Sequence, residues 1–109
     1  MSNQAQAAAA FNALGDPTRR RILEQLRRGP VSVGELAQRL SAGRPGVSKH
    51  LKVLEGAGLV EHRSQATRNL YALAPAALVP VQQWLTDVWG GALDAYAEHV
   101  AQRTGKKER

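Results

Sequence analysis

Residues 32–54 carry two short helix signals separated by a sharp break, and this pattern restricts the possible folds more than any other part of the chain. Ser32 and Glu35 stand in the S-x-x-E spacing of a capping box, which predicts a helix that begins just after Ser32. Leu36 and Leu40 then repeat at the i, i+4 spacing that directs one apolar stripe toward a core. We therefore expect a short amphipathic helix in the first part of this segment.

The break falls at residues 41–43, and a second helix is expected to begin near Arg44. Pro45 fits the first turn of a helix, because its missing N–H would have no intrahelical partner there in any case. Gly58 predicts the end of this helix, since a residue without Cβ suits the left-handed position that follows a helix. Between these points one side of the helix is apolar and carries Val47, Leu51 and Leu54.

The opposite side of the second helix is polar and basic, with Arg44, Ser48, Lys49 and Lys52. Two short helices joined by a tight turn, the second with such a face, are typical of a helix-turn-helix unit whose second helix enters the major groove of DNA. Arginine can pair with guanine O6 and N7, serine can bond to bases or phosphates, and lysines neutralise phosphate charge. The plainer interpretation is a solvated surface, but solvation alone does not require these side chains at the helix N-terminus.

The composition favours a negatively charged partner. The chain has 109 residues and a net charge of +6, and residues 16–68 hold 11 basic and 5 acidic side chains. The positive charge is therefore concentrated around the expected DNA-binding helix, as attraction to a polyanion requires. We expect one domain over residues 1–102 and a basic, disordered tail over residues 103–109. A domain of this size gains stability from a partner chain, so a dimer is expected.

What the chain lacks narrows its function. The absence of cysteine excludes disulfides and thiolate metal sites. No apolar run approaches the length of a membrane span and the N-terminus has no basic region of a secretion signal, so we expect a cytoplasmic protein. With no Gly-rich phosphate loop and no nucleophile beside a base, neither enzymatic activity nor a cofactor is expected. On the last helix only Asp94 and Glu98 share the i, i+4 spacing of a ligand pair, and we expect no metal site.

Two further helices are expected before this unit. Residues 4–14 form a weak helix candidate, and Asp16 with Pro17 predicts the N-cap and first residue of the next helix. That helix is expected to end near Arg28, because a Gly-Pro pair follows.

After Gly58 the apolar spacing changes from a helical period to alternation, which predicts two short strands over residues 59–64 and 69–73. Arg63 and Arg68 stand near the tip of this hairpin. We interpret it as a wing whose arginines contact phosphates or the adjacent minor groove. A solvated hairpin attached to the core is the alternative.

A turn over residues 75–79 leads into a long helix expected over residues 80–102. Its apolar face is too broad for a small domain to cover, so we interpret it, together with the apolar side of the first helix, as a subunit interface. The alternative is that both tryptophans lie in the protomer's own core. In mid-helix, Gly90 and Gly91 cost helix stability, which a bend or the close approach of a second helix would offset. The expected interface residues are Phe11, Leu14, Val81, Trp84, Leu85, Val88 and Trp89.

Two sequence motifs resemble those of a known family. Residues 11–23, FNALGDPTRRRIL, and residues 47–60, VSKHLKVLEGAGLV, closely resemble the ArsR family of bacterial winged-helix repressors. The resemblance covers residues 11–73, while the last helix matches only in length and apolar pattern. It implies a homodimer joined through the first and last helices, the basic helix placed in the major groove, and repression by covering a promoter. Gly43 and Gly46 depart from the family pattern, which more often has serine and alanine there.

The chain as a whole predicts a mainly α fold with a small β-hairpin, a winged helix-turn-helix of about five helices and a two-stranded wing. We expect a homodimeric, sequence-specific DNA-binding repressor whose partners are double-stranded DNA, a second copy of the chain and an unidentified small-molecule or protein effector. The alternatives are a winged helix that binds another protein, and a repressor that senses a metal through carboxylates and histidine on the last helix, as many members of the resembled family do. His50 lies beside the buried stripe, which favours a structural role over base contact, and His62 is interpreted as a surface residue. The residues expected to contact DNA are Arg44, Pro45, Ser48, Lys49, His50, Lys52, Arg63, Gln65 and Arg68.

Overall fold

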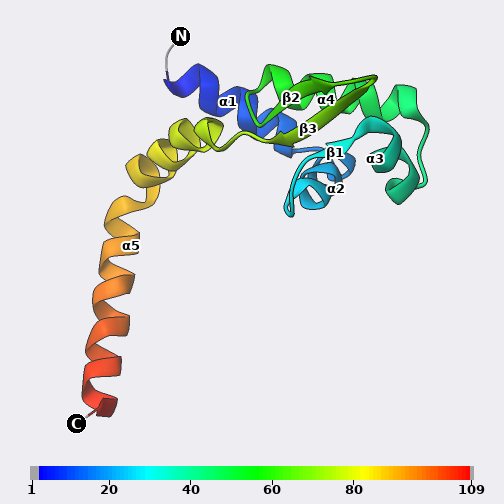
Figure 1. The fold of residues 1–109 in the computed structure, drawn as a ribbon. Coiled ribbons are helices and arrows are strands. Elements are labelled where there is room, and N and C mark those ends of the chain that lie inside the picture. Colours follow the sequence, from blue (N-terminus) through cyan, green and yellow to red (C-terminus); the bar gives the residue numbers. More distant parts are fainter. Residues whose placement is uncertain (1–2, 109) are drawn as a thin grey trace.

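The computed structural model describes residues 3–108, with side chains described from residue 4 to residue 103. Within this range the chain forms five α-helices and three strands, and a short 3₁₀ turn precedes the last helix (Figure 1). The fold is therefore mainly α, as expected. The elements are α1 (Asn3–Leu14), α2 (Pro17–Leu26), β1 (Val31–Ser32), α3 (Val33–Leu40), α4 (Arg44–Gly56), β2 (Val60–Gln65), β3 (Arg68–Leu73), the 3₁₀ turn (Pro75–Ala77) and α5 (Leu78–Glu108).

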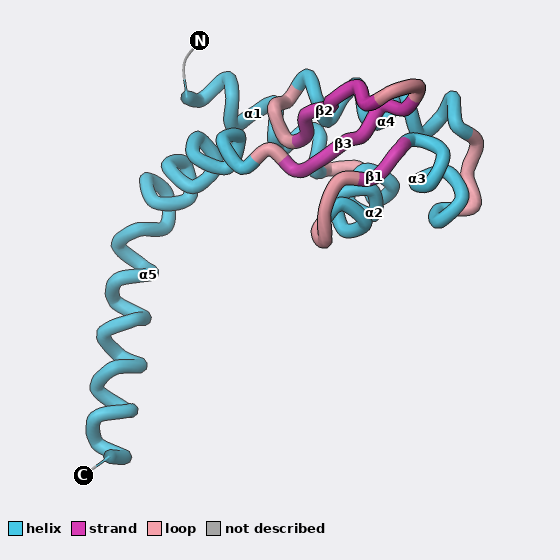
Figure 2. Tube along the Cα trace, viewed as in Figure 1, coloured by secondary structure: helices cyan, strands magenta, loops and turns pink. Residues whose placement is uncertain are grey.

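α5 projects away from the rest of the molecule. Helices α1–α4 and the sheet gather in one body, and α5 packs against α1 at its start and then runs outward (Figure 1, Figure 2). The molecule measures 59 × 35 × 24 Å along its principal axes. Figure 1 shows α5 bending where its colour changes from yellow to orange. In the described range, every helix is too short or too polar to cross a membrane.

The turn between α1 and α2 is held by side chains that cap both helices. The Asp16 carboxylate accepts hydrogen bonds from the backbone N–H groups of Thr18 (2.8 Å) and Arg19 (3.1 Å), which confirms Asp16 as the N-cap. The Arg19 guanidinium in turn donates to the carbonyl oxygens of Ala13 (2.7 Å) and Asn12 (3.0 Å). These contacts satisfy carbonyl groups in the last turn of α1.

Glycines with positive φ follow both α2 and α4. α2 ends two residues before the expected Arg28, and Gly29 then adopts a φ of 141° that a helix does not allow. After α4, Gly58 has a φ of 78°, and the Leu59 N–H donates to the Leu54 carbonyl at 2.9 Å. This bond belongs to a Schellman motif, so the expected end of the second helix is confirmed.

The sheet has three strands and not the two expected. β2 and β3 form the predicted antiparallel hairpin, and β1 adds to the free edge of β3, which gives the order β1-β3-β2. Val31 pairs with Tyr71, and Ser32 pairs with Leu70. The expectation of a two-stranded wing is wrong because a two-residue strand is too short to show an alternating pattern. Ser32 also accepts a hydrogen bond from the Glu35 N–H (3.2 Å), so one residue ends β1 and caps α3.

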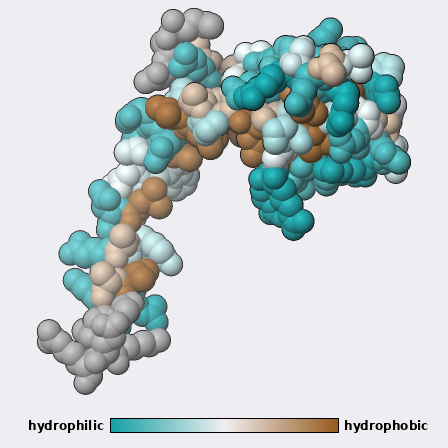
Figure 3. Space-filling view, in the orientation of Figure 1, coloured by the Kyte–Doolittle hydropathy of each residue, from teal (hydrophilic) through white to brown (hydrophobic). Residues whose placement is uncertain are grey.

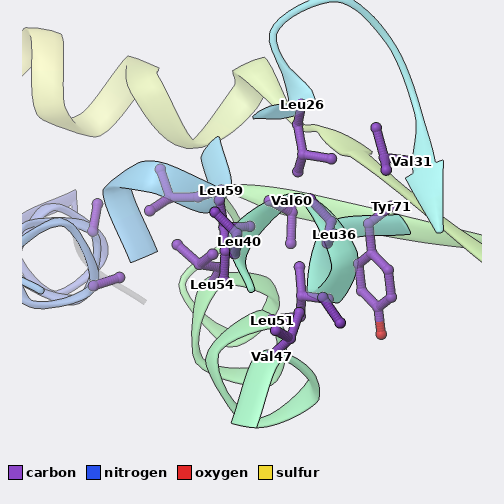
Figure 4. Packing of buried hydrophobic residues seen from close by; sticks show 14 of the residues in the cluster. Leu26, Val31, Leu36, Leu40, Val47, Leu51, Leu54, Leu59, Val60 and Tyr71 are labelled. Atoms are coloured by element: carbon purple, nitrogen blue, oxygen red, sulfur yellow. The ribbon is translucent and has the colours of Figure 1, made fainter. Parts of the chain in front are cut away.

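The core lies where α2, α3 and α4 meet the sheet (Figure 4). The three apolar residues predicted on α4 are all buried, which fixes the orientation of that helix. Val81 of α5 is only 8% exposed and joins this core, so little of its surface is left for a partner. The largest fully buried side chains are Ile22, Leu26, Leu36, Val47, Leu51 and Leu54.

α5 is longer than expected at both ends. It begins at Leu78 and continues through Glu108, so it includes most of residues 103–109, which we expected to be a disordered tail. The segment contains no proline, and its arginine, lysines and glutamate favour a helix, whereas Thr104 and Gly105 do not. Arg109 lies outside the described residues.

Candidate nucleic-acid interface

α4 presents basic side chains to solvent because its opposite side is fixed in the core. Val47 and Leu51 are buried, while Arg44 and Lys49 are exposed. The helix therefore cannot rotate its charged face inward without exposing its apolar residues. The other α4 residues expected to contact DNA are the exposed Pro45 and Lys52 and the half-buried Ser48 and His50.

The N-terminus of α4 adds backbone donors to this surface. Gly43 is the N-cap, and it makes no side-chain hydrogen bond to the first turn of α4. The first backbone N–H groups of the helix are therefore left without a side-chain acceptor from the cap. Because these groups lie at the positive end of the helix dipole, they suit a phosphate oxygen.

The wing carries its polar side chains near its turn. The two-residue turn Ala66–Thr67 joins β2 to β3, and Ala66 has a φ of 56°. Arg63 and Gln65 of β2 are exposed and line a shallow hollow on the wing, and Arg68 at the start of β3 is exposed as well. The structure thus brings the three wing residues expected to contact DNA to the surface.

Arg68 is also tied to the helix-turn-helix. Its Nη2 atom lies 2.6 Å from Oε1 of Glu35 on α3, and the Ser32 hydroxyl donates to the same oxygen at 3.1 Å. Arg39 Nη2 lies 3.6 Å from the other carboxylate oxygen of Glu35. Glu35 therefore connects the wing to α3, a contact between residues distant in sequence that local spacing does not predict.

His50 lies close enough to Asp16 to influence its carboxyl group. The pKa of Asp16 is below its usual value, chiefly because the Arg19 backbone N–H bonds to the carboxylate, and the charge of His50 contributes in the same direction.

His62 has partners that the sequence did not indicate. Its Nδ1 atom pairs with the carboxylate of Glu55 on α4, and its ring centroid lies 5.4 Å from that of Tyr71. His62 is exposed, as expected, but it also connects β2 to the last turn of α4. Burial, and then the nearby charge of Glu55, raise the pKa of Tyr71 above its usual value.

A second surface is apolar and lies along α5, beginning at its contact with α1 (Figure 3). The rings of Phe11 and Trp84 meet edge to face, with centroids 5.1 Å apart and planes at 72°. Both rings are nevertheless exposed for more than a third of their surface. Leu14 packs against the core and is half-buried, and Leu93 is an exposed residue that we did not include in the expected interface. The exposed apolar residues farther along α5 are Leu85, Val88, Trp89, Leu93, Tyr96 and Val100.

Known proteins match this chain in both sequence and fold. Residues 14–63 match the family described as a helix-turn-helix domain. The chain is 46% identical over 100 residues to the HTH-type transcriptional regulator Rv2034 of Mycobacterium tuberculosis. The aligned region covers 92% of this chain and 94% of the relative. A solved ArsR-like transcriptional regulator from Rhodococcus has a TM-score of 0.73 and 33% sequence identity, and covers 91% of this chain and 92% of that one. The chain belongs to the ArsR family of winged helix-turn-helix transcriptional regulators.

This ArsR-family regulator is also similar to a protein named as a repressor. It is 31% identical over 75 residues to the transcriptional repressor SdpR of Bacillus subtilis. The aligned region covers 69% of this chain and 83% of the relative. The helix-turn-helix match over residues 14–63 contains the whole of α2, α3 and α4. It therefore includes each of the α4 side chains described above.

The last helix of this ArsR-family regulator shows no gathered metal ligands in its described part. Among the described residues, no three histidine, aspartate or glutamate side chains come together as a metal site. The Asp87 carboxylate, one of the acidic groups on α5, accepts a hydrogen bond from Nε2 of Gln83 at 2.9 Å.

Proposed function

We propose that this ArsR-family regulator is a homodimeric repressor that binds a pseudo-palindromic operator, with α4 of each protomer in the major groove and the wing on the adjoining DNA. The observation that carries the proposal is the presence of two different surfaces on one small chain. The basic N-terminal half of α4 suits a polyanion, and the apolar face of α1 and α5 suits a second copy. The repressor named among its relatives supports repression by covering a promoter.

The side chains at the N-terminal end of α4 are assigned to the bases. Arg44, Ser48 and Lys49 stand in the N-terminal half of α4, which is the part of a helix-turn-helix that meets base edges, and each can bond to a base or to the phosphate beside it. Pro45 and His50 flank these residues and complete the α4 contact surface. The residues assigned to the DNA backbone are Lys52, Arg63, Gln65 and Arg68.

The apolar face of α5 is assigned to the dimer interface. Val88 and Trp89 are 55% and 53% exposed in the single chain, and covering apolar surface contributes about 25 cal/mol per Å². A twofold axis places the same face on both partners. A Cβ on Gly91 would meet no heavy atom of the described residues within 4 Å, so the protomer itself gives no packing reason for glycine there. Either the bend of α5 or the close approach of the partner's helix offsets the cost of glycine there.

The twofold axis fixes the form of the operator. Two recognition helices related by this axis contact half-sites about 34–36 Å apart, or one helical turn, on the same side of the duplex. The operator is therefore an inverted repeat with that spacing.

Selection of bound fragments from a random DNA pool tests DNA binding, symmetry and spacing together. We expect an inverted repeat, and an affinity for the selected duplex that falls steeply with added salt. Arg44→Ala is expected to weaken binding by about 1–3 kcal/mol and to relax the preference at one base in each half-site. Arg103→Ala makes the same charge change near the C-terminal end of α5, the end of the helix that runs away from α4 in Figure 1, and serves as the matched control. Recovery of unrelated fragments with no common sequence would overturn the proposal.

A further inference from the structure

The side chain of Arg44 occupies space that a side chain at Gly34 would need. Arg44 is the first residue of α4, and Gly34 is the second residue of α3. A Cβ built on Gly34 would lie 2.7 Å from Nη2, 3.2 Å from Cζ and 3.5 Å from Nε of Arg44. The first distance is shorter than real Cβ contacts, so the guanidinium and a side chain at residue 34 cannot both keep these positions.

The backbone of α3 does not itself require glycine at this position. The described glycines with positive φ are Gly29 and Gly58, whereas Gly34 lies within a regular helix. Glycine inside a helix lowers its stability relative to alanine, because glycine loses more conformational freedom on folding. The three heavy atoms nearest to a Cβ added at this position all belong to the guanidinium group of Arg44.

Other contacts of Arg44 do not explain its position. Among the described residues, no carboxylate lies within ion-pair distance of the Arg44 guanidinium. The acidic residue beside Gly34 is Glu35, and its carboxylate is paired with Arg68 and Arg39. The guanidinium of the exposed Arg44 thus lies over Gly34 of α3 without an ion pair, and its N–H groups stay available to another partner.

We infer that Gly34 is a positioning residue for DNA recognition: by lacking a Cβ, it lets the Arg44 guanidinium rest on the first turn of α3. This inference rests on the proposed function, in which Arg44 contacts a base. A free arginine loses rotamer freedom when it is fixed against a base, and a side chain that is already held loses less. Gly34 thereby contributes to affinity and base preference without contacting DNA itself.

Gly34→Ala tests the inference against the duplex recovered by the selection experiment. The new Cβ displaces the far end of a flexible side chain, so the protein is expected to fold with an unchanged or higher midpoint of thermal unfolding. Its affinity for the duplex is expected to fall by at least about threefold, and by no more than the loss of about 5- to 150-fold expected for Arg44→Ala. The base whose preference is relaxed should be the same in both variants.

A double-mutant cycle separates a positioning role from a general effect on the fold. In an Arg44→Ala background, Gly34→Ala is expected to cause no further loss of affinity, because the displaced group is gone. Gly56→Ala is the matched control, since it also adds a Cβ to a helical glycine and meets no heavy atom of the described residues within 4 Å. This control should bind the duplex as the wild type does.

The outcomes distinguish this inference from the proposed function. If Gly34→Ala binds with wild-type affinity and base preference while Arg44→Ala loses both, the inference is wrong and the proposed function stands. If Arg44→Ala itself leaves base preference unchanged, the base contact of Arg44 is wrong and the inference is lost with it. If Gly34→Ala is less stable than the wild type, recovery of stability in the double variant supports the contact, and an equal loss in both backgrounds overturns it.

Discussion

Glu35 on α3 and Arg68 on the wing form an ion pair, with 2.6 Å between Oε1 and Nη2. Both side chains are exposed to solvent, at 43% and 59%, so the pair contributes little to stability. Its importance lies in its place, because it connects the wing to α3 of the helix-turn-helix and occupies an arginine that a phosphate could bind. In the proposed complex, Glu35 competes with DNA for Arg68.

Glu35→Gln is expected to tighten DNA binding. The change removes a negative charge beside the wing and releases Arg68 for a phosphate, so the dependence of affinity on salt should steepen by about one phosphate contact. The free energy of unfolding should fall by less than about 1 kcal/mol. Salt titration of the selected duplex measures the first effect, and Glu24→Gln, at an exposed position on α2, provides the same change in net charge. Weaker binding with an unchanged salt dependence would show that the pair instead holds the wing in place for DNA.

The lowered pKa of Asp16 predicts a specific dependence of stability on pH. The carboxylate accepts backbone N–H bonds at the start of α2, so its charged form is favoured in the folded protein. A group whose folded pKa is lowered stabilises the protein above its unfolded value of about 4, and this contribution is lost as the pH falls through the folded value. Asp16→Asn keeps a good N-cap but cannot titrate.

The measurement is the difference in unfolding midpoint between wild type and Asp16→Asn across pH. We expect the wild type to have the advantage at neutral pH and to lose it as the pH falls below about 4. Asp16→Ala should be less stable than either protein at neutral pH, because it has no side-chain acceptor for the cap. A difference between wild type and Asp16→Asn that does not change with pH would contradict this account.

The helix boundaries set by local chemistry could be read from the sequence. Asp16 and Gly58 act within a few residues of their own position, and the structure shows the bonds that their chemistry predicts. The buried side of α4 could be predicted from helical spacing for the same reason, because Val47, Leu51 and Leu54 lie on one side of the helix and that side faces the core.

Features that depend on contacts between distant residues could not be read in this way. β1 was missed because its pairing partner on β3 lies far along the chain, and Arg19 was not expected to bind the carbonyl groups of α1. In the candidate site, helical periodicity predicted that Arg44 is exposed, but it did not predict that the Arg44 guanidinium lies over Gly34. Helical spacing placed Val81 on the apolar face of α5, but spacing does not show which element covers a face, and in the structure Val81 lies in the protomer's own core.

Trp89→Glu is expected to break the dimer without unfolding the protomer. The indole is 53% exposed in the single chain, so a glutamate there meets water in the monomer but would be buried and unpaired in the proposed interface. We expect the dissociation constant to rise by at least about thirtyfold, which corresponds to about 2 kcal/mol. Sedimentation equilibrium measures this change, and Gln82→Glu adds the same charge to an exposed polar position of α5 as a control. An unchanged dissociation constant would show that the subunit interface does not include this face of α5.

Glycine is expected to be required at residue 58 because of its positive φ, and not because an added side chain would clash with neighbouring atoms. Its φ of 78° is unfavourable for a residue with a Cβ, whereas the nearest atom to an added Cβ, Ala77 Cβ, lies at an ordinary 3.5 Å. Gly58→Ala should therefore lower the free energy of unfolding by about 1–2 kcal/mol in chemical denaturation. Gly58→Asn should lose less, because asparagine tolerates this region, and Gly56→Ala should lose nothing, because that glycine is helical. An equal loss for alanine and asparagine at residue 58 would point to crowding, and the turn from α4 into β2 would then depend on packing instead of φ.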